Sequence, residues 1–266
     1  MPNAARFDGR AADYSAGRPT YPPAVLDVLR DRIGLTNDWY VLDVGAGTGI
    51  SSELFLAAGH RVTAVEPNDA MRAEADARLG ANPNYRTIAA PAECVPLPGG
   101  SADLIVAAQA FHWFDPVAFA VECRRLLSPR GRVLLMWNTL DPAATPAATA
   151  YQAVVDRHAI DLTRVQSKWR AAESNAMQWF DPATFMRVDL PHALPYSAET
   201  LFARMASSSY MPPRGHPAFE TMRADLRSVF NAHAAGGVFT LPYTCELYFG
   251  VPRGPAGAVP PTAESC

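Results

Sequence analysis

The chain has 266 residues, of which 49% are hydrophobic and 18% are charged. This composition is typical of a folded globular protein and argues against a disordered or fibrous one. The formal net charge of −3 argues against a basic nucleic-acid-binding surface, so no nucleic-acid partner is expected. No apolar run approaches the roughly 20 residues that span a bilayer, and the N-terminus lacks an apolar signal core. We therefore expect no membrane partner and a cytoplasmic location.

The cysteines are Cys94, Cys123, Cys245 and Cys266, with no C-x-x-C pair among them. No histidine stands at ligand spacing from any of them. The sequence therefore predicts neither a metal site nor a disulfide framework, and reduced thiols are expected.

Hydrophobic periodicity predicts alternating strands and helices along the first half of the chain. A polar, proline-rich segment over residues 1–23 comes before a helix over Ala24–Ile33. Later helices are predicted around Leu54–Ala58 and at Asp69–Leu79, Pro116–Leu127, Ala198–Ala206 and Pro217–His233. Strands are predicted at Tyr40–Val44, Arg61–Val65, Tyr85–Ala89, Ala102–Ala107, Arg132–Trp137, Phe185–Leu190 and Phe239–Val251. The alternation predicts an α/β fold with a parallel sheet covered by helices on both faces.

After Asn138 the pattern changes to longer and mostly helical stretches. We expect a single domain over residues 1–251, with residues 1–23 as an N-terminal lid and helical cap segments at about 138–184 and 198–235. Residues 252–266 are rich in Pro, Gly and Ala, which predicts a disordered tail.

The most informative segment is Val41–Gly49, a buried strand that leads into a glycine-rich turn. Glycines allow positive φ angles and let a ligand approach the main chain closely. Glu66 follows at the end of the next strand, where a carboxylate can accept the hydroxyls of an adenosine ribose. The glycine spacing is G-x-G-x-G, whereas dinucleotide-binding loops show G-x-G-x-x-G. The pattern therefore indicates a nucleoside cofactor and disfavours a nicotinamide dinucleotide.

The strand and turn resemble motif I of class I S-adenosylmethionine-dependent methyltransferases. Weaker likenesses follow in Val65–Pro67, Ala92–Pro98, Asp103–Val106 and Leu126–Arg132. The opening block F-x3-A-x2-Y-x3-R-P-x-Y-P, over residues 7–22, and the block Phe111–Phe114 resemble a small-molecule branch that includes trans-aconitate-type methyltransferases. The resemblance implies a Rossmann-like, doubly wound and mostly parallel seven-stranded sheet, an N-terminal lid and a helical cap insertion.

The resemblance also implies which residues bind S-adenosyl-L-methionine. By this likeness the methionine end meets Tyr14, Arg18, Asp43, Gly45, Gly47 and Gln109, the ribose meets Glu66, and the adenine meets Met71, Ala92 and Glu93. An equally open alternative for Asp43 is that it only satisfies N–H groups of the loop. Met71 has the alternative of being a core methionine.

His112 is the candidate catalytic residue, because it follows the fourth strand at the edge where the transferable methyl group is expected. The alternative is that His112 only packs in an aromatic cluster. Later aromatic and methionine side chains are expected to roof the site or to lie in the core: Trp169, Trp179, Phe180, Tyr210 and Met211. Arg204 and Arg214 have the chemistry to receive a substrate carboxylate, but exposed surface positions are expected for both.

The expected function is methyl transfer to a small-molecule acceptor with an O, N or C nucleophile, a carboxylate or a secondary metabolite being candidates. Two alternatives stay open: a cofactor-binding protein without methyl transfer, and a nicotinamide-dependent oxidoreductase. A monomer or a homodimer is expected.

Overall fold

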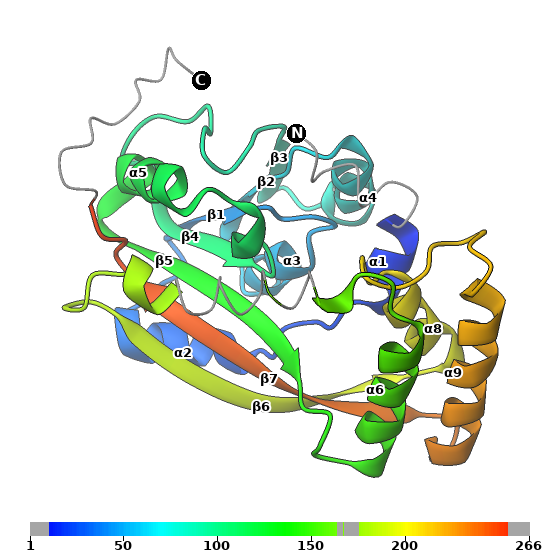
Figure 1. Ribbon diagram of the computed structural model, residues 1–266. Coiled ribbons are helices and arrows are strands. Elements are labelled where there is room, and N and C mark those ends of the chain that lie inside the picture. The colour runs from blue at the N-terminus through cyan, green and yellow to red at the C-terminus, as the bar shows by residue number, and fades with distance from the viewer. Residues whose placement is uncertain (1–10, 164–166, 168–175, 255–266) are drawn as a thin grey trace.

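The computed structural model describes residues 11–163, 167 and 176–254 (Figure 1). Its centre is a seven-stranded sheet in the order β3-β2-β1-β4-β5-β7-β6. The strands are β1 (Tyr40–Val44), β2 (Arg61–Val65), β3 (Tyr85–Ile88), β4 (Ala102–Ala108), β5 (Leu127–Leu140), β6 (Met186–Tyr196) and β7 (Phe239–Gly250). Strands β1 to β5 run parallel, and β7 is antiparallel to both β5 and β6.

This topology confirms the mostly parallel, doubly wound sheet. The chain moves outward from β1 to β3 and then returns to add β4 on the other side of β1. Ligands of open α/β sheets bind at the carboxyl ends of the strands, next to such a reversal. The fold therefore places the candidate site at the ends of β1 and β4.

Helices cover both faces of the sheet. One face carries α2 (Ala24–Ile33), α3 (Ile50–Ala57) and α4 (Asp69–Leu79), which share an apolar cluster with the strands. The other face carries α5 (Pro116–Leu126) and residues 176–180, whose side chains form a second cluster. The strand interiors are buried on both faces, as parallel sheets require.

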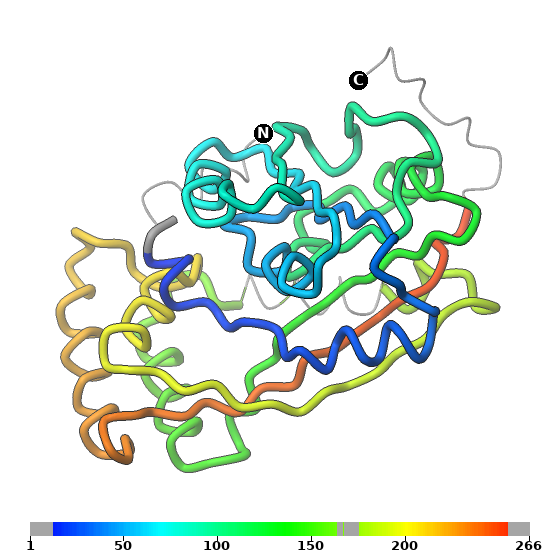
Figure 2. Tube along the Cα trace, turned by 180° about the vertical axis from the view of Figure 1, so that it is seen from behind, coloured from blue at the N-terminus to red at the C-terminus, as the bar shows by residue number. Residues whose placement is uncertain are grey.

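Three further helices form an outer helical layer at the far ends of β6 and β7 (Figure 1). They are α6 (Pro146–His158), α8 (Ala198–Ala206) and α9 (Phe219–His233). Together with the protruding strand ends they enclose a third apolar cluster. Figure 2 shows the N-terminal segment in blue, which begins beside this layer and then runs to α2.

The structure differs from the sequence-based elements in the N-terminal segment and near Asn138. Residues Ala11–Gly17 form helix α1, which ends two residues before Pro19 because proline disfavours helix at the residue that precedes it. Residues 138–140 were expected to be helical, but they continue β5 because long β7 offers them partners, such as Thr244 for Thr139.

Strand β6 is longer than expected and contains Pro191 and Pro195. It lies at the edge of the sheet, where an N–H group that points away from the partner strand needs no acceptor, so proline is tolerated.

Two further expectations concern the C-terminal tail and the cysteines. Pro252 pairs with Phe180 and the Arg253 N–H donates to the Trp179 carbonyl, so these first two residues of the expected tail are held in place. Residues 255–266 lie outside the described part of the chain. Cys94 is disulfide-bonded, which corrects the expectation of reduced thiols throughout. Within the described ranges, no helix is both long and apolar enough to cross a membrane.

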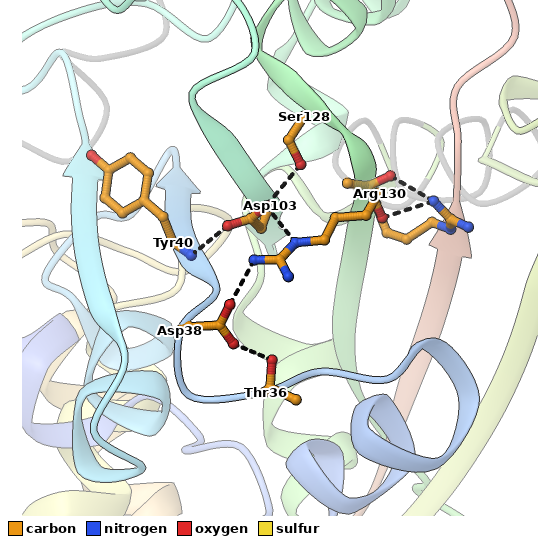
Figure 3. A network of polar contacts seen from close by, with 8 residues as sticks. Thr36, Asp38, Tyr40, Asp103, Ser128 and Arg130 are labelled. Atoms are coloured by element: carbon orange, nitrogen blue, oxygen red, sulfur yellow. Dashed lines mark hydrogen bonds and ion pairs between the residues drawn. The ribbon is translucent and has the colours of Figure 1, made fainter.

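A polar network ties the amino ends of the central strands together (Figure 3). Asp103 accepts hydrogen bonds from the Tyr40 N–H at 3.0 Å, the Ser128 hydroxyl at 2.7 Å and the Arg130 Nε at 3.0 Å. Arg130 also reaches Asp38 at 2.9 Å. Burial raises the pKa of Asp103, but these bonds outweigh it and hold that pKa below its usual value. The network lies at the strand ends opposite the candidate site and serves the fold.

Candidate functional site

The glycine-rich turn follows β1 and reaches the first residue of α3. Gly45, Gly47 and Gly49 have φ angles of 66°, 57° and 79°, which side chains with a Cβ rarely adopt. A Cβ on Gly45 would lie 2.8 Å from the Ala110 Cβ, so this glycine is also required for packing. At Gly47 nothing lies within 4 Å of that position. The backbone at Gly47 therefore faces open space in which a ligand can approach it.

Glu66 follows β2 and holds the turn from the side. Its Oε2 accepts the Gly47 N–H at 2.9 Å, and its Oε1 accepts the Asn68 N–H at 2.9 Å. Burial raises the pKa of Glu66 above its ordinary value, although both bonds lower it. Each carboxylate oxygen accepts more than one hydrogen bond, so Glu66 keeps acceptor capacity for a ligand's hydroxyl groups.

Asp43 lies beneath the turn and is fully buried. Its Oδ2 accepts the hydroxyl groups of Ser51 at 2.7 Å and Ser52 at 2.6 Å, whereas its Oδ1 has no hydrogen-bond partner. Burial raises the pKa of Asp43 to about 6. The Ser52 backbone also hydrogen-bonds to Asp43, whereas the Gly47 N–H of the turn donates to Glu66.

The N-terminal segment brings Tyr14 and Arg18 to the turn. A small cavity is lined by Tyr14, Arg18, Pro19, Tyr21, Gly45, Ala46, Ile50, Ser51, Ala108, Gln109 and Arg204. We call it the loop cavity. The Arg18 guanidinium lies 4.6 Å from the centre of the Tyr14 ring, and its Nη2 donates to the Ser207 carbonyl at 3.0 Å. The Arg18 Nε is buried without a partner.

Gln109 closes the loop cavity from the end of β4. It is a non-glycine residue in the left-handed region, with φ of 53°. Its N–H donates to the Met136 carbonyl at 2.8 Å, and its side-chain Nε2 donates to the Asn138 carbonyl at 3.0 Å. Residues held in this region cost about 1–3 kcal/mol and cluster at functional sites. These two hydrogen bonds hold Gln109 against β5, and its side chain lines the loop cavity.

A second cavity of about 410 Å³ adjoins the first. We call it the outer cavity, because helix α6 and residues near α8 contribute to it. Its lining is Arg18, Gln109, Trp137, Asn138, Thr139, Leu140, Pro142, Tyr151, Gln152, Val155, Leu162, Arg204, Tyr210 and Glu246. Arg18, Gln109 and Arg204 line both cavities, so the two spaces meet at these side chains.

Of the residues expected around adenine, Met71 lies in the first turn of α4, and Ala92 and Glu93 lie in the loop after β3. Met71 and Ala92 are 3% and 5% exposed, respectively, and Glu93 is half-buried and accepts the Asp115 N–H at 2.8 Å. None of the three lines either cavity. Their contact with adenine stays a prediction.

His112 lies in the short 3-10 helix Phe111–Trp113 after β4, as expected. Its ring centre lies 4.6 Å from that of Trp113, and His112 lines neither cavity. His112 thus packs against Trp113, and its catalytic role stays a prediction.

Arg204 was expected on the surface, and this expectation is wrong. Only 7% of Arg204 is exposed, whereas the Arg214 side chain is 61% exposed and pairs with Asp13 at 2.8 Å. Three residues before Arg204 stands Leu201, fully buried on the same face of α8. That spacing is the sequence signal for the burial of Arg204.

The late aromatic and methionine residues divide between core and cavity. Trp179, Phe180 and Met211 are buried in the apolar clusters, and Tyr210 lines the outer cavity. Trp169 lies outside the described residues. In the described part of the chain, no group of three or more His, Cys, Asp or Glu side chains is arranged to hold a metal ion.

Residues 42–135 match a family model described as a methyltransferase domain. An uncharacterized methyltransferase of Mycobacterium tuberculosis is 38% identical over 135 residues, which span 51% of this chain and 53% of that protein. A methyltransferase-like protein of Schizosaccharomyces pombe is 29% identical over 84% of this chain and 85% of its own length. The chain thus covers about half the length of its mycobacterial relative.

A solved structure from Anaeromyxobacter dehalogenans, assigned as a type II methyltransferase, shares the fold. Its TM-score is 0.57 at 23% identity, over 88% of this chain and 97% of that one. The sheet topology, the family match and this likeness agree. Residues 42–135 thus resemble a methyltransferase domain, and the described chain shares the fold of that solved structure.

Proposed function

We propose that this chain transfers the methyl group of S-adenosylmethionine to a small-molecule acceptor. The observation that carries the proposal is the convergence of Tyr14 and Arg18, the glycine turn and Gln109 on the loop cavity, which shares three lining side chains with the outer cavity. One space suits the methionine end of the donor. The other offers room for the molecule that receives the methyl group.

Two buried atoms without partners support this assignment. The Arg18 Nε is a charged donor that lacks an acceptor, and the Asp43 Oδ1 is an acceptor that lacks a donor. Unsatisfied buried polar groups are costly, so each is expected to gain a partner from a ligand. The amino acid end of S-adenosylmethionine carries one carboxylate and one ammonium group, which complement Arg18 and Asp43, respectively. Glu66 would hold the ribose hydroxyls.

The bound donor supplies an electrophilic methyl group on its sulfonium. The protein's own contribution is positional: holding two reactants in line removes several kcal/mol from a reaction barrier without any covalent step. Gln109, fixed by two hydrogen bonds, would orient the donor at the boundary of the two cavities. His112 is our candidate for a base that removes a proton from the acceptor. Residues 1–23 would act as the lid over the donor.

The outer cavity sets the class of acceptor. Its volume of about 410 Å³ lies in the range of small-molecule sites, and apolar and polar residues share its lining. We therefore assign a small metabolite rather than a macromolecule, and we retain the trans-aconitate-type branch as the finer proposal.

Incubation with methyl-labelled S-adenosylmethionine and a metabolite extract tests this function. Label is expected in a small-molecule product with the wild-type chain, and far less with Glu66→Ala at the same donor concentration. Donor binding without any labelled product would favour a binding protein without methyl transfer. Hydride transfer from NADH without donor binding would favour the oxidoreductase instead.

A further inference from the structure

Arg204 is a buried cation without a counter-ion. Its Nη1 donates to the Ser208 hydroxyl at 3.0 Å and its Nε to the Tyr243 hydroxyl at 3.3 Å. Tyr210 is a third hydrogen-bond partner of Arg204, and all three partners are hydroxyl groups. No carboxylate within the described ranges lies within 4.0 Å of the Arg204 guanidinium. A buried charge that lacks an opposite charge is costly, so a ligand that brings the opposite charge would bind favourably at Arg204.

The same wall of the outer cavity holds a second group without a partner. Tyr151, from α6, is 1% exposed and its hydroxyl has no hydrogen-bond partner. Tyr151 and Arg204 line the cavity together with Tyr210. Burial raises the pKa of Tyr210, but Arg204, Ser208 and other neighbours outweigh this effect and lower it. The potential at this wall is therefore positive.

Two other charged groups of the cavity do not neutralise Arg204. The Glu246 carboxylate lies 3.7 Å from the Arg187 Nη2, so a cation outside the cavity already accompanies it. Arg18 adds a second positive charge at the boundary with the loop cavity, where the donor carboxylate is proposed to lie.

From these observations we infer that Arg204 and the Tyr151 hydroxyl bind an anionic group of the methyl acceptor, a carboxylate or another small oxyanion. The inference rests on the proposed function, because it assigns the outer cavity to the acceptor. A guanidinium presents paired N–H donors that match the two oxygens of a carboxylate, and a phenol adds one more. Arg204 and Tyr151 are thus residues that determine acceptor specificity.

The test is calorimetric titration of the full chain with a panel of anions, both with and without S-adenosylhomocysteine. The panel is acetate, malonate, tricarballylate and inorganic phosphate, with the methyl esters of the carboxylates as neutral controls. At least one anion is expected to bind, and its ester at least about tenfold more weakly. Arg204→Gln should weaken the binding of that anion by about 10- to 100-fold, because the substitution removes charge-assisted hydrogen bonds to it. Arg204→Lys, which keeps the charge, should retain part of it.

Tyr151→Phe separates binding from folding. Removing an unsatisfied buried hydroxyl does not lower stability, so the melting temperature should hold while anion affinity falls about 3- to 10-fold. Arg223→Gln is the matched control, because the Arg223 side chain is 50% exposed on α9 and lines neither cavity. It should leave anion binding unchanged.

Three results would overturn the inference: no anion of the panel binds, acid and ester bind alike, or Arg204→Gln binds the anion as the wild type does. If Arg204→Gln weakens S-adenosylhomocysteine as strongly as Arg18→Gln does, Arg204 serves the donor and the inference is wrong. Failure of the wild type to bind S-adenosylhomocysteine counts against the proposed function. The anion titrations in the absence of S-adenosylhomocysteine still decide whether Arg204 binds an anion.

Discussion

Gly17 lies directly against the backbone of Arg204: a Cβ on Gly17 would be 2.1 Å from the Arg204 amide nitrogen. Helix α1 therefore docks on α8 at a point where only glycine fits. Arg18 adds a hydrogen bond to the Ser207 carbonyl, and Asp13 pairs with Arg214. The N-terminal segment is held by the outer helical layer as well as by any ligand.

Gly17→Ala should displace α1 and weaken donor binding by about tenfold or more. Alanine favours a helix over glycine by about 1 kcal/mol, but a contact of 2.1 Å with backbone atoms cannot be relieved by a side-chain rotation. Calorimetry with S-adenosylhomocysteine measures the loss. The exposed neighbour Ala16 supplies the control, and Ala16→Leu should bind normally. Full affinity in Gly17→Ala would show that the docking does not support the site.

Glu66→Ala should weaken the binding of S-adenosylhomocysteine by about 10- to 100-fold. The substitution removes the proposed ribose acceptor and also releases the Gly47 N–H, and hydrogen bonds to charged groups contribute about 1.5–3 kcal/mol each. Glu66→Gln keeps acceptor capacity and should lose less. Glu220→Ala, an acid on α9 whose side chain is 76% exposed, is the control for the loss of a carboxylate. Equal affinities in all variants would remove Glu66 from the site.

Stability should depend on pH through Asp43. Burial raises its pKa from 3.8 to about 6, so between these values the folded chain holds a proton that the unfolded chain has released. The Asp43 contribution to the free energy of unfolding therefore falls as pH rises through this window, by on the order of 3 kcal/mol. Asp43→Asn has no such dependence. Its free energy of unfolding, measured by urea titration, should therefore rise relative to that of the wild type between pH 4 and pH 7. Asp27→Asn, at an exposed position, should show the same pH dependence of stability as the wild type. The same result for Asp43→Asn would contradict the raised pKa of Asp43.

His112→Ala should lower the rate of methyl transfer more than it lowers donor affinity. If His112 removes a proton in the transition state, single-turnover rates should fall by about 10²- to 10⁴-fold, with a pH dependence near neutrality. An acceptor that is already ionised needs no base, and the effect should then be small and appear mainly in KM. Unchanged rate and KM in a folded variant would assign His112 to the aromatic cluster.

Local patterns were enough to predict the sheet and the turn. The alternation of strands and helices, together with the spacing of Gly45, Gly47 and Gly49, lies within short windows, and the observed strand order agrees with it. Helical spacing from Leu201 indicates that Arg204 is buried, but the contact of Gly17 with Arg204 joins segments far apart in sequence, and no local pattern encodes it. The extension of β5 past Asn138 likewise depends on the length of β7. The loop cavity was thus predictable in outline, whereas the charged wall of the outer cavity was not.

The glycine turn, Glu66 and the loop cavity are together proposed to bind the S-adenosyl cofactor rather than a nicotinamide dinucleotide. Parallel calorimetric titrations of the full chain with S-adenosylhomocysteine and with NADH test this proposal most directly. We expect S-adenosylhomocysteine to bind with a dissociation constant on the order of micromolar, and NADH to show no measurable binding. Tight binding of NADH without binding of S-adenosylhomocysteine would contradict it.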